Sequence, residues 1–141
     1  ERSAEVFRAV APILGLPHRG YLDPPVSEGG MPVISITGSR DRTVPPGEWG
    51  QDTFTTTSDG DVYYYSSASA ITKVWAEAHS CDTTVPAEPV DIGSSSMECR
   101  GWSYCQSDSQ WPPVLDCRGD MGHMYNLSSS WPLILDFFEQ L

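Results

Sequence analysis

The chain has 141 residues, which is enough for one domain with a hydrophobic core. Its formal net charge of −11 and its pI of about 4.4 would repel phosphate backbones and anionic headgroups, so neither nucleic acid nor a membrane surface is an expected partner. No apolar run approaches the roughly 20 residues that a membrane-spanning helix needs, so no membrane span is expected.

Three short apolar segments predict β-strands. The first covers about 8–13, within EVFRAVAPILG, and ends before a glycine and a proline. PVISITG at 32–38 is the second, and PVLDCRG at 113–119 is the third. Continuous apolar runs of this length are typical of strands buried on both faces of a parallel sheet. The segments 45–61 and 82–112 are rich in Gly, Pro, Ser, Thr and Asp, and predict irregular structure.

Two segments predict helices. The segment 61–81 turns helical, and its expected buried stripe is formed by Ala70, Ile71, Val74, Trp75 and Ala78. The closing segment 128–141 predicts a second helix, with Ser130 as its cap and Pro132 in its first turn. Its expected buried stripe is Leu133, Ile134, Phe137, Phe138 and Leu141.

This order of elements predicts an α/β fold with a mostly parallel sheet and flanking helices. Three strands alone would leave a long apolar sheet edge exposed, so residues 1–141 are expected to form a single partial domain.

The four cysteines are Cys81, Cys99, Cys105 and Cys117. There is no CxxC motif, no zinc-like His/Cys spacing and no calcium-loop pattern, so no metal site is expected. Two disulfides in an oxidising compartment are the first interpretation, and reduced structural cysteines are the alternative. The spacing leaves all three connectivities open. Asn126 begins an Asn-Leu-Ser sequon, which predicts glycosylation and agrees with a secreted protein.

Two residues with catalytic chemistry follow the second and third predicted strands. Asp41 comes after PVISITG, and His123 comes after PVLDCRG in the segment GDMGHMY. The carboxyl ends of parallel strands share one rim of a sheet, so both side chains are expected there. A carboxylate that accepts a hydrogen bond from an imidazole prepares it to act as a general base toward a hydroxyl. The alternatives are a turn-forming Asp and an ordinary loop His.

The same segments resemble secreted α/β-hydrolase esterases of the polyhydroxybutyrate depolymerase and feruloyl esterase group. ITGSRDRTVP resembles the group's acid segment hGxxDxxVP, and SASAITKVWAEAHSC resembles its helix end before a cysteine. The run from YCQSDSQWPP to ILDFF resembles its cysteine, strand, GGGHxWP and final helix, and EVFRAVAPILG resembles a strand that follows its nucleophile. The resemblance runs nearly end to end and implies the carboxyl-terminal part of an α/β-hydrolase fold.

The resemblance assigns roles to particular residues. Asp41 matches the triad acid and His123 the triad base. Cys81 and Cys105 match the family's paired cysteines, which would leave Cys99 to bond Cys117.

The chain also departs from the family pattern. Met124 and Tyr125 replace the family's Trp-Pro after the His, where the loop often shapes the substrate pocket, and Met121 replaces a glycine and could narrow the site. Trp102 and Tyr104 could line an aromatic substrate cleft. The nucleophile elbow GxSxG is absent, so the nucleophile and the oxyanion hole are expected on a missing amino-terminal half or on a partner chain.

These observations predict a serine-type carboxylic ester hydrolase that acts on feruloyl- or acetyl-carbohydrate esters or on polyester oligomers. No cofactor is expected, and the isolated chain should be inactive because it holds two of the three catalytic groups. The alternative is a non-catalytic structural or binding subunit that retains the hydrolase scaffold. A small secreted lectin-like module with an aromatic cleft is a third interpretation, which explains the cysteines and tryptophans but not the placement of Asp41 and His123.

Overall fold

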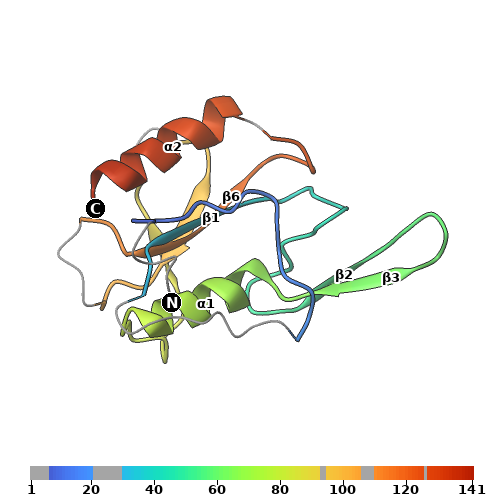
Figure 1. Ribbon diagram of the computed structural model, residues 1–141, viewed down its shortest axis with the longest axis horizontal. Helices are drawn as coiled ribbons and strands as arrows, with labels where there is room; N and C mark the ends of the chain where they lie inside the picture. The colour runs from blue at the N-terminus through green and yellow to red at the C-terminus, as the bar shows by residue number, and fades with distance from the viewer. Residues whose placement is uncertain (1–6, 21–29, 93–94, 106–109, 126) are drawn as a thin grey trace.

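The computed structural model describes residues 7–20, 30–92, 95–105, 110–125 and 127–141. Figure 1 shows its elements in chain order, which are β1 (Val33–Gly38), β2 (Thr53–Thr56), β3 (Val62–Tyr65), α1 (Ala68–Ala78), β4 (Glu88–Val90), β5 (Glu98–Gly101), β6 (Val114–Gly119) and α2 (Leu127–Glu139). No helix in these ranges is long and apolar enough to cross a membrane.

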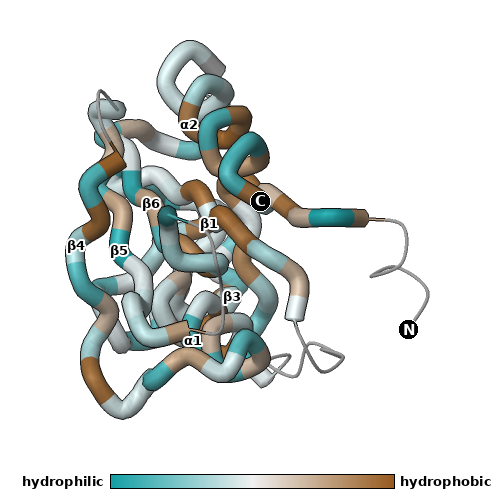
Figure 2. Tube along the Cα trace, turned by 90° about the vertical axis from the view of Figure 1, so that its left-hand side faces the viewer, coloured by the Kyte–Doolittle hydropathy of each residue, from teal (hydrophilic) through white to brown (hydrophobic). Residues whose placement is uncertain are grey.

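The main sheet is mixed, with the strand order β1-β6-β5-β4 (Figure 2). Only β1 and β6 pair in parallel, whereas β6 pairs antiparallel with β5 and β5 pairs antiparallel with β4. The prediction of a mostly parallel α/β-hydrolase sheet with flanking helices is therefore wrong. The cause lies in the segment 82–112, which looked irregular but folds back on itself to form β4 and β5 beside β6. Strands joined by such short connections run antiparallel.

The segment predicted as the first strand does not form a regular strand. It makes two isolated parallel bridges to β1, from Val10 to Val33 and from Ile13 to Ile36. Backbone hydrogen bonds support them, since Ile34 N donates to Val10 O at 3.1 Å and Leu14 N donates to Ile36 O at 2.8 Å. The segment therefore covers part of the outer edge of β1.

A two-stranded antiparallel hairpin, β2–β3, projects away from the main sheet (Figure 1). Phe54 and Tyr64 are directly paired across it, and both are more than half exposed. The sequence interpretation missed this hairpin because its strands are stabilised by pairing with each other rather than by burial.

The two faces of β1 and β6 differ in chemistry. Side chains alternate along each strand, so Ile34, Ile36, Leu115 and Cys117 pack on the α2 side, in the main hydrophobic core with Phe137. The opposite face carries Val33 and Val114 beside α1, followed along the strands by the buried polar side chains of Ser35, Thr37 and Asp116. Figure 1 shows α2 and α1 on opposite sides of these strands.

Helix α1 forms inside the segment 61–81 that was predicted as helical, but Val62–Tyr65 of that segment form β3 instead, and the buried stripe of the helix is shifted. Its cap is Ser67, whose Oγ accepts a hydrogen bond from Ala70 N at 3.2 Å. The buried residues are Ala68, Thr72 and Ala76, whereas all five residues of the predicted stripe are half-buried. The helix packs through its small side chains, which the apolar periodicity did not indicate.

Helix α2 begins earlier than predicted. It starts at Leu127, so Ser130 and Pro132 lie inside the helix rather than at its cap and first turn. Pro132 has no N–H to donate, so one hydrogen bond of the first turns is missing. Its buried stripe is confirmed for Leu133, Ile134 and Phe137, but Phe138 is exposed and Leu141, beyond the end of the helix, is half-buried.

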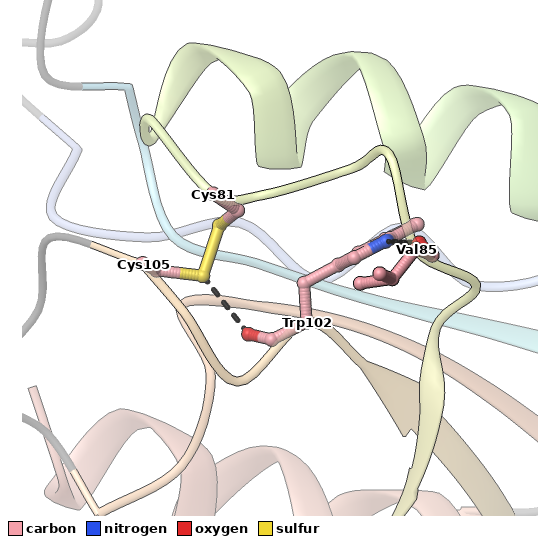
Figure 3. Close-up of a disulfide and its surroundings, with 4 residues drawn as sticks. All are labelled: Cys81, Val85, Trp102 and Cys105. Atoms are coloured by element: carbon pink, nitrogen blue, oxygen red, sulfur yellow. Dashed lines mark hydrogen bonds between the residues drawn. A yellow bond between two sulfur atoms is a disulfide. The ribbon is translucent and has the colours of Figure 1, made fainter.

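Both disulfides implied by the resemblance are confirmed. Cys81 bonds Cys105, close to Trp102 (Figure 3), and Cys99 bonds Cys117 across β5 and β6, where the two residues are direct partners in the sheet. Two disulfides are compatible with an oxidising or extracellular environment. The predicted glycosylation site Asn126 lies outside the described residues.

Candidate active site

The site begins where β1 and β6 end side by side. Gly38 and Gly119 are paired in the register of the two parallel strands. The pairing continues into the loops, because Ser39 N donates to Gly119 O at 2.9 Å and Arg40 N donates to Met121 O at 3.1 Å. The loop after β1 and the loop after β6 are therefore held against each other by backbone hydrogen bonds.

Gly38 makes this close approach possible. A Cβ atom at this position would lie 2.3 Å from Met121 O and 3.0 Å from Gly122 O. Both atoms belong to the backbone, so no side-chain rotation could relieve the contact. Gly38 is thus required by packing at the point where the two loops meet.

Asp41 is a buried residue whose carboxylate is fixed by its own loop. The residue is 4% exposed, and its Oδ1 accepts hydrogen bonds from Thr43 N at 2.8 Å and Val44 N at 2.9 Å. Its own backbone N donates to Gly38 O at 3.0 Å. Asp41 therefore does act as a turn former, but this role occupies only one of its two carboxylate oxygens.

The second carboxylate oxygen faces His123. Asp41 Oδ2 lies 2.8 Å from His123 Nδ1, and the His123 side chain is 42% exposed. The structure thus brings together the two residues that the strand pattern placed on one rim. A carboxylate only accepts hydrogen bonds, so Nδ1 carries the proton and the neutral ring presents Nε2 as its basic atom.

In the part of the chain that the structure describes, the hydrogen bond of the His123 ring is the one to Asp41 Oδ2. An oriented imidazole next to a buried carboxylate can accept a proton from a hydroxyl or water and return it to a leaving group. In the described ranges, no group of three His, Cys, Asp or Glu side chains could hold a metal ion.

The predicted substrate-binding residues divide into two groups. Met124 and Tyr125 follow His123 directly and are 75% and 69% exposed, so their side chains are available beside the dyad. Met121 is buried in the main core, where it lies near Met97 and Gly119, so it does not narrow the site as expected.

Trp102 is not brought to the dyad. It is 6% exposed and directly follows Gly101, which pairs with Leu115 near the amino end of β6. His123 lies beyond the carboxyl end of that strand, and the four residue steps from Leu115 to Gly119 alone span about 13 Å. Tyr104, 76% exposed, is close in sequence to Trp102. The proposed aromatic cleft and the dyad therefore do not share one edge of the sheet.

Sequence reasoning missed an ion pair between the two loops. Arg40 Nε lies 2.6 Å from Asp120 Oδ1, and Arg40 Nη2 donates to Asp120 O at 2.9 Å. Both side chains are well exposed, so the pair contributes little stability, but it joins the loops that carry Asp41 and His123. The sequence signal for this pair was a basic and an acidic residue just after two adjacent strands. Arg40 lies two residues after Gly38, and Asp120 directly follows Gly119.

A scan against protein-family models and a search of curated protein sequences found no match to this chain. The interpretation of the site therefore depends on its geometry and on the short motifs that surround Asp41 and His123.

Proposed function

We propose that this chain supplies the acid and the base of a serine-type carboxylic ester hydrolase. The observation that carries the proposal is the 2.8 Å hydrogen bond between the buried Asp41 carboxylate and the partly exposed His123 ring. A carboxylate that is fixed by two backbone N–H groups and aimed at an imidazole is the arrangement that such catalysis needs.

In this mechanism a serine hydroxyl attacks the ester carbonyl while His123 Nε2 takes its proton. Collapse of the tetrahedral intermediate breaks the bond to the leaving alcohol, which receives that proton from His123. Water then attacks the acyl-serine. His123 Nε2 takes a proton from this water and returns it to the serine oxygen as the acid is released. Asp41 holds the ring tautomer and stabilises the imidazolium that forms in each half-reaction.

The serine belongs, in this proposal, to a polypeptide segment or partner chain outside the 141 residues. The short motifs around Asp41 and His123 favour feruloyl- or acetyl-carbohydrate esters or polyester oligomers as substrates. The exposed Met124 and Tyr125 would contact the acyl or alcohol group, since they flank His123. The two disulfides are compatible with a secreted enzyme.

One observation favours a non-catalytic alternative, in which the chain is a structural or binding subunit. The hydrogen bond described for the His123 ring joins it to Asp41 and not to a hydroxyl. A purely structural role, however, does not require a buried carboxylate to be directed at a partly exposed imidazole. The geometry therefore favours catalysis.

The proposal is tested on native material from the source organism, treated with a fluorophosphonate probe before denaturing electrophoresis. We expect a labelled serine, either on a longer form of this chain or on a polypeptide that co-purifies with it. In that active assembly, His123→Gln should lower kcat by about 10³-fold or more, and Asp41→Asn should lower it comparably because Asn favours the wrong tautomer.

His18→Gln is the matched control, because His18 is an exposed histidine that contacts the hairpin rings of Tyr63 and Tyr65 and lies outside the dyad. It should leave kcat unchanged. An assembly that labels nowhere, or a His123→Gln variant that keeps full activity, would exclude the catalytic role and leave the binding subunit.

A further inference from the structure

A second candidate site lies on the polar face of the sheet, under the first half of α1. A cavity of about 460 Å³ opens between α1, the segment 83–87, strands β5 and β6, and the loop that carries Trp49. Its volume is within the range of small-molecule sites, about 300–1,000 Å³. Neither Asp41 nor His123 lines it, so the site is independent of the proposed hydrolase function.

Asp116 lines this cavity with a buried and incompletely satisfied carboxylate. The residue is 1% exposed, and its Oδ2 pairs with Arg118 Nη2 at 3.2 Å, whereas its Oδ1 has no hydrogen-bond partner. Burial raises the pKa of Asp116, an effect that the nearby Arg118 charge only partly opposes. A buried acceptor without a partner is costly, so a ligand that donates to Oδ1 would remove that cost.

Two tryptophans give the cavity rigid apolar walls. Trp102 is 6% exposed, and its Nε1 donates to Val85 O at 3.0 Å (Figure 3). Trp49 is held by the guanidinium groups of Arg118 and Arg100, whose central carbons lie 3.7 Å and 4.3 Å from its ring centre. Arg100 is itself fixed by Glu98, at 2.9 Å from its Nη2.

The charges around the cavity restrict the ligand. A cationic ligand would meet Arg100, Lys73 and the nearby Arg118, and an anionic ligand would meet the Asp116 carboxylate. A purely apolar ligand would leave Asp116 Oδ1 unpaired. The remaining class is a neutral ligand with several hydroxyls, which donate to Asp116 and accept from the cationic side chains, and with C–H faces that pack on the indoles.

We propose that this cavity binds a neutral saccharide of one or two rings, with Asp116 as the buried acceptor and Trp102 and Trp49 as the walls. The site is pre-formed, because Trp102 is hydrogen-bonded to Val85 and both arginines are held in ion pairs. Preorganised aromatic and charged groups reduce the entropy lost on binding.

The test uses the disaccharides cellobiose, maltose and lactose as probes, with sodium benzoate and benzylamine as charged comparators. Binding to the full protein is followed by isothermal titration calorimetry and by tryptophan fluorescence. At least one disaccharide is expected to bind saturably with one site per chain, while both charged probes bind at least tenfold more weakly. Saturable binding of neither cellobiose, maltose nor lactose, or tighter binding of a charged probe, would overturn the proposal.

Two variants locate the binding. Ala70→Trp places an indole at a half-buried cavity-lining position of α1, and it should weaken disaccharide binding at least tenfold. Ala78→Trp is the matched control, since Ala78 is a half-buried alanine of the same helix that does not line the cavity, and its affinity should stay within twofold.

Asp116→Asn changes the buried acceptor without filling the cavity and should also weaken binding about tenfold. Far-ultraviolet circular dichroism and thermal unfolding establish that each variant is folded. A folded Ala70→Trp protein that binds the disaccharide as tightly as the wild type would place the ligand elsewhere and refute the assignment.

Discussion

Gly38→Ala should separate the two loops that carry the dyad. The added Cβ would lie 2.3 Å from Met121 O and 3.0 Å from Gly122 O, whereas ordinary contacts of a Cβ lie at 3.4–4 Å. The loops must therefore move apart by about 1 Å or more at this point, because both obstructing atoms are backbone oxygens. That movement would stretch the hydrogen bond from Ser39 N to Gly119 O and the one from Arg40 N to Met121 O.

The size of the effect follows from these contacts. Overpacking of this kind costs about 1–3 kcal/mol, and weakening two backbone hydrogen bonds adds about 1 kcal/mol. We expect the free energy of unfolding to fall by about 2–4 kcal/mol, out of a total of about 5–15 kcal/mol for a domain of this size. Urea unfolding followed by tryptophan fluorescence measures this difference directly.

Gly122→Ala is the matched control for this prediction. A Cβ at Gly122 would meet only Arg40 O at 3.9 Å, an ordinary contact, so its unfolding free energy should change by less than about 1 kcal/mol. A second readout is the Nδ1–H proton of His123 in the NMR spectrum, whose hydrogen bond to Asp41 should shift it downfield in the wild type and in Gly122→Ala. If Gly38→Ala keeps both this resonance and wild-type stability, the close approach of the loops is not what positions the dyad.

Three further predictions concern other parts of the fold. Ser67→Ala removes the oxygen that accepts from Ala70 N and should cost about 1 kcal/mol in thermal unfolding, so an unchanged midpoint would contradict the capping role. Limited reduction should open the Cys81–Cys105 bridge first, because Cys105 is half-buried whereas Cys99 and Cys117 are both buried. Iodoacetamide labelling and mass spectrometry identify the bridge that opens, and the reverse order would contradict the burial pattern. Because burial raises the pKa of Asp116 above its ordinary value of 3.8, the stability contributed by its protonated form is complete below pH 3.8 and is lost as the pH rises through the folded-state pKa. Urea unfolding should therefore show wild-type stability falling relative to Asp116→Asn as the pH rises, by at most about 1.4 kcal/mol per pH unit, and a difference that does not vary with pH would refute this.

The position of the dyad could be predicted because its two strands carry strong local signals. PVISITG and PVLDCRG are seven-residue segments that begin with Pro-Val and end in glycine, and they form the one parallel pair of the described sheet. Asp41 and His123 follow these glycines by three and four residues, so parallel pairing alone brings them to the same rim. The predicted contact needed no knowledge of the other strands.

The rest of the sheet could not be predicted in this way. Strand β4 has three residues and contains Pro89, and β5 alternates charged residues with Cys99 and Gly101, so neither contains an apolar run. Their positions depend on long-range pairing with β6 and on the disulfide between Cys99 and Cys117. Local periodicity does not contain information about these long-range pairs. The prediction of a mostly parallel sheet is therefore wrong for the segment 82–112, where the chain folds back into the antiparallel strands β4 and β5.

The sequence contains a signal for the polar face under α1, but the pattern of PVISITG predicted only a strand buried on both faces. All six residues of β1 are buried, as a strand covered on both faces should be, yet Ser35 and Thr37 alternate with Ile34 and Ile36. Asp116 occupies the same face of β6, and an apolar core would not tolerate its carboxylate, of which Oδ1 has no hydrogen-bond partner. A period of two inside a fully buried strand therefore indicates which face is core and which face can hold a ligand, and the cavity beneath α1 lies on that polar face.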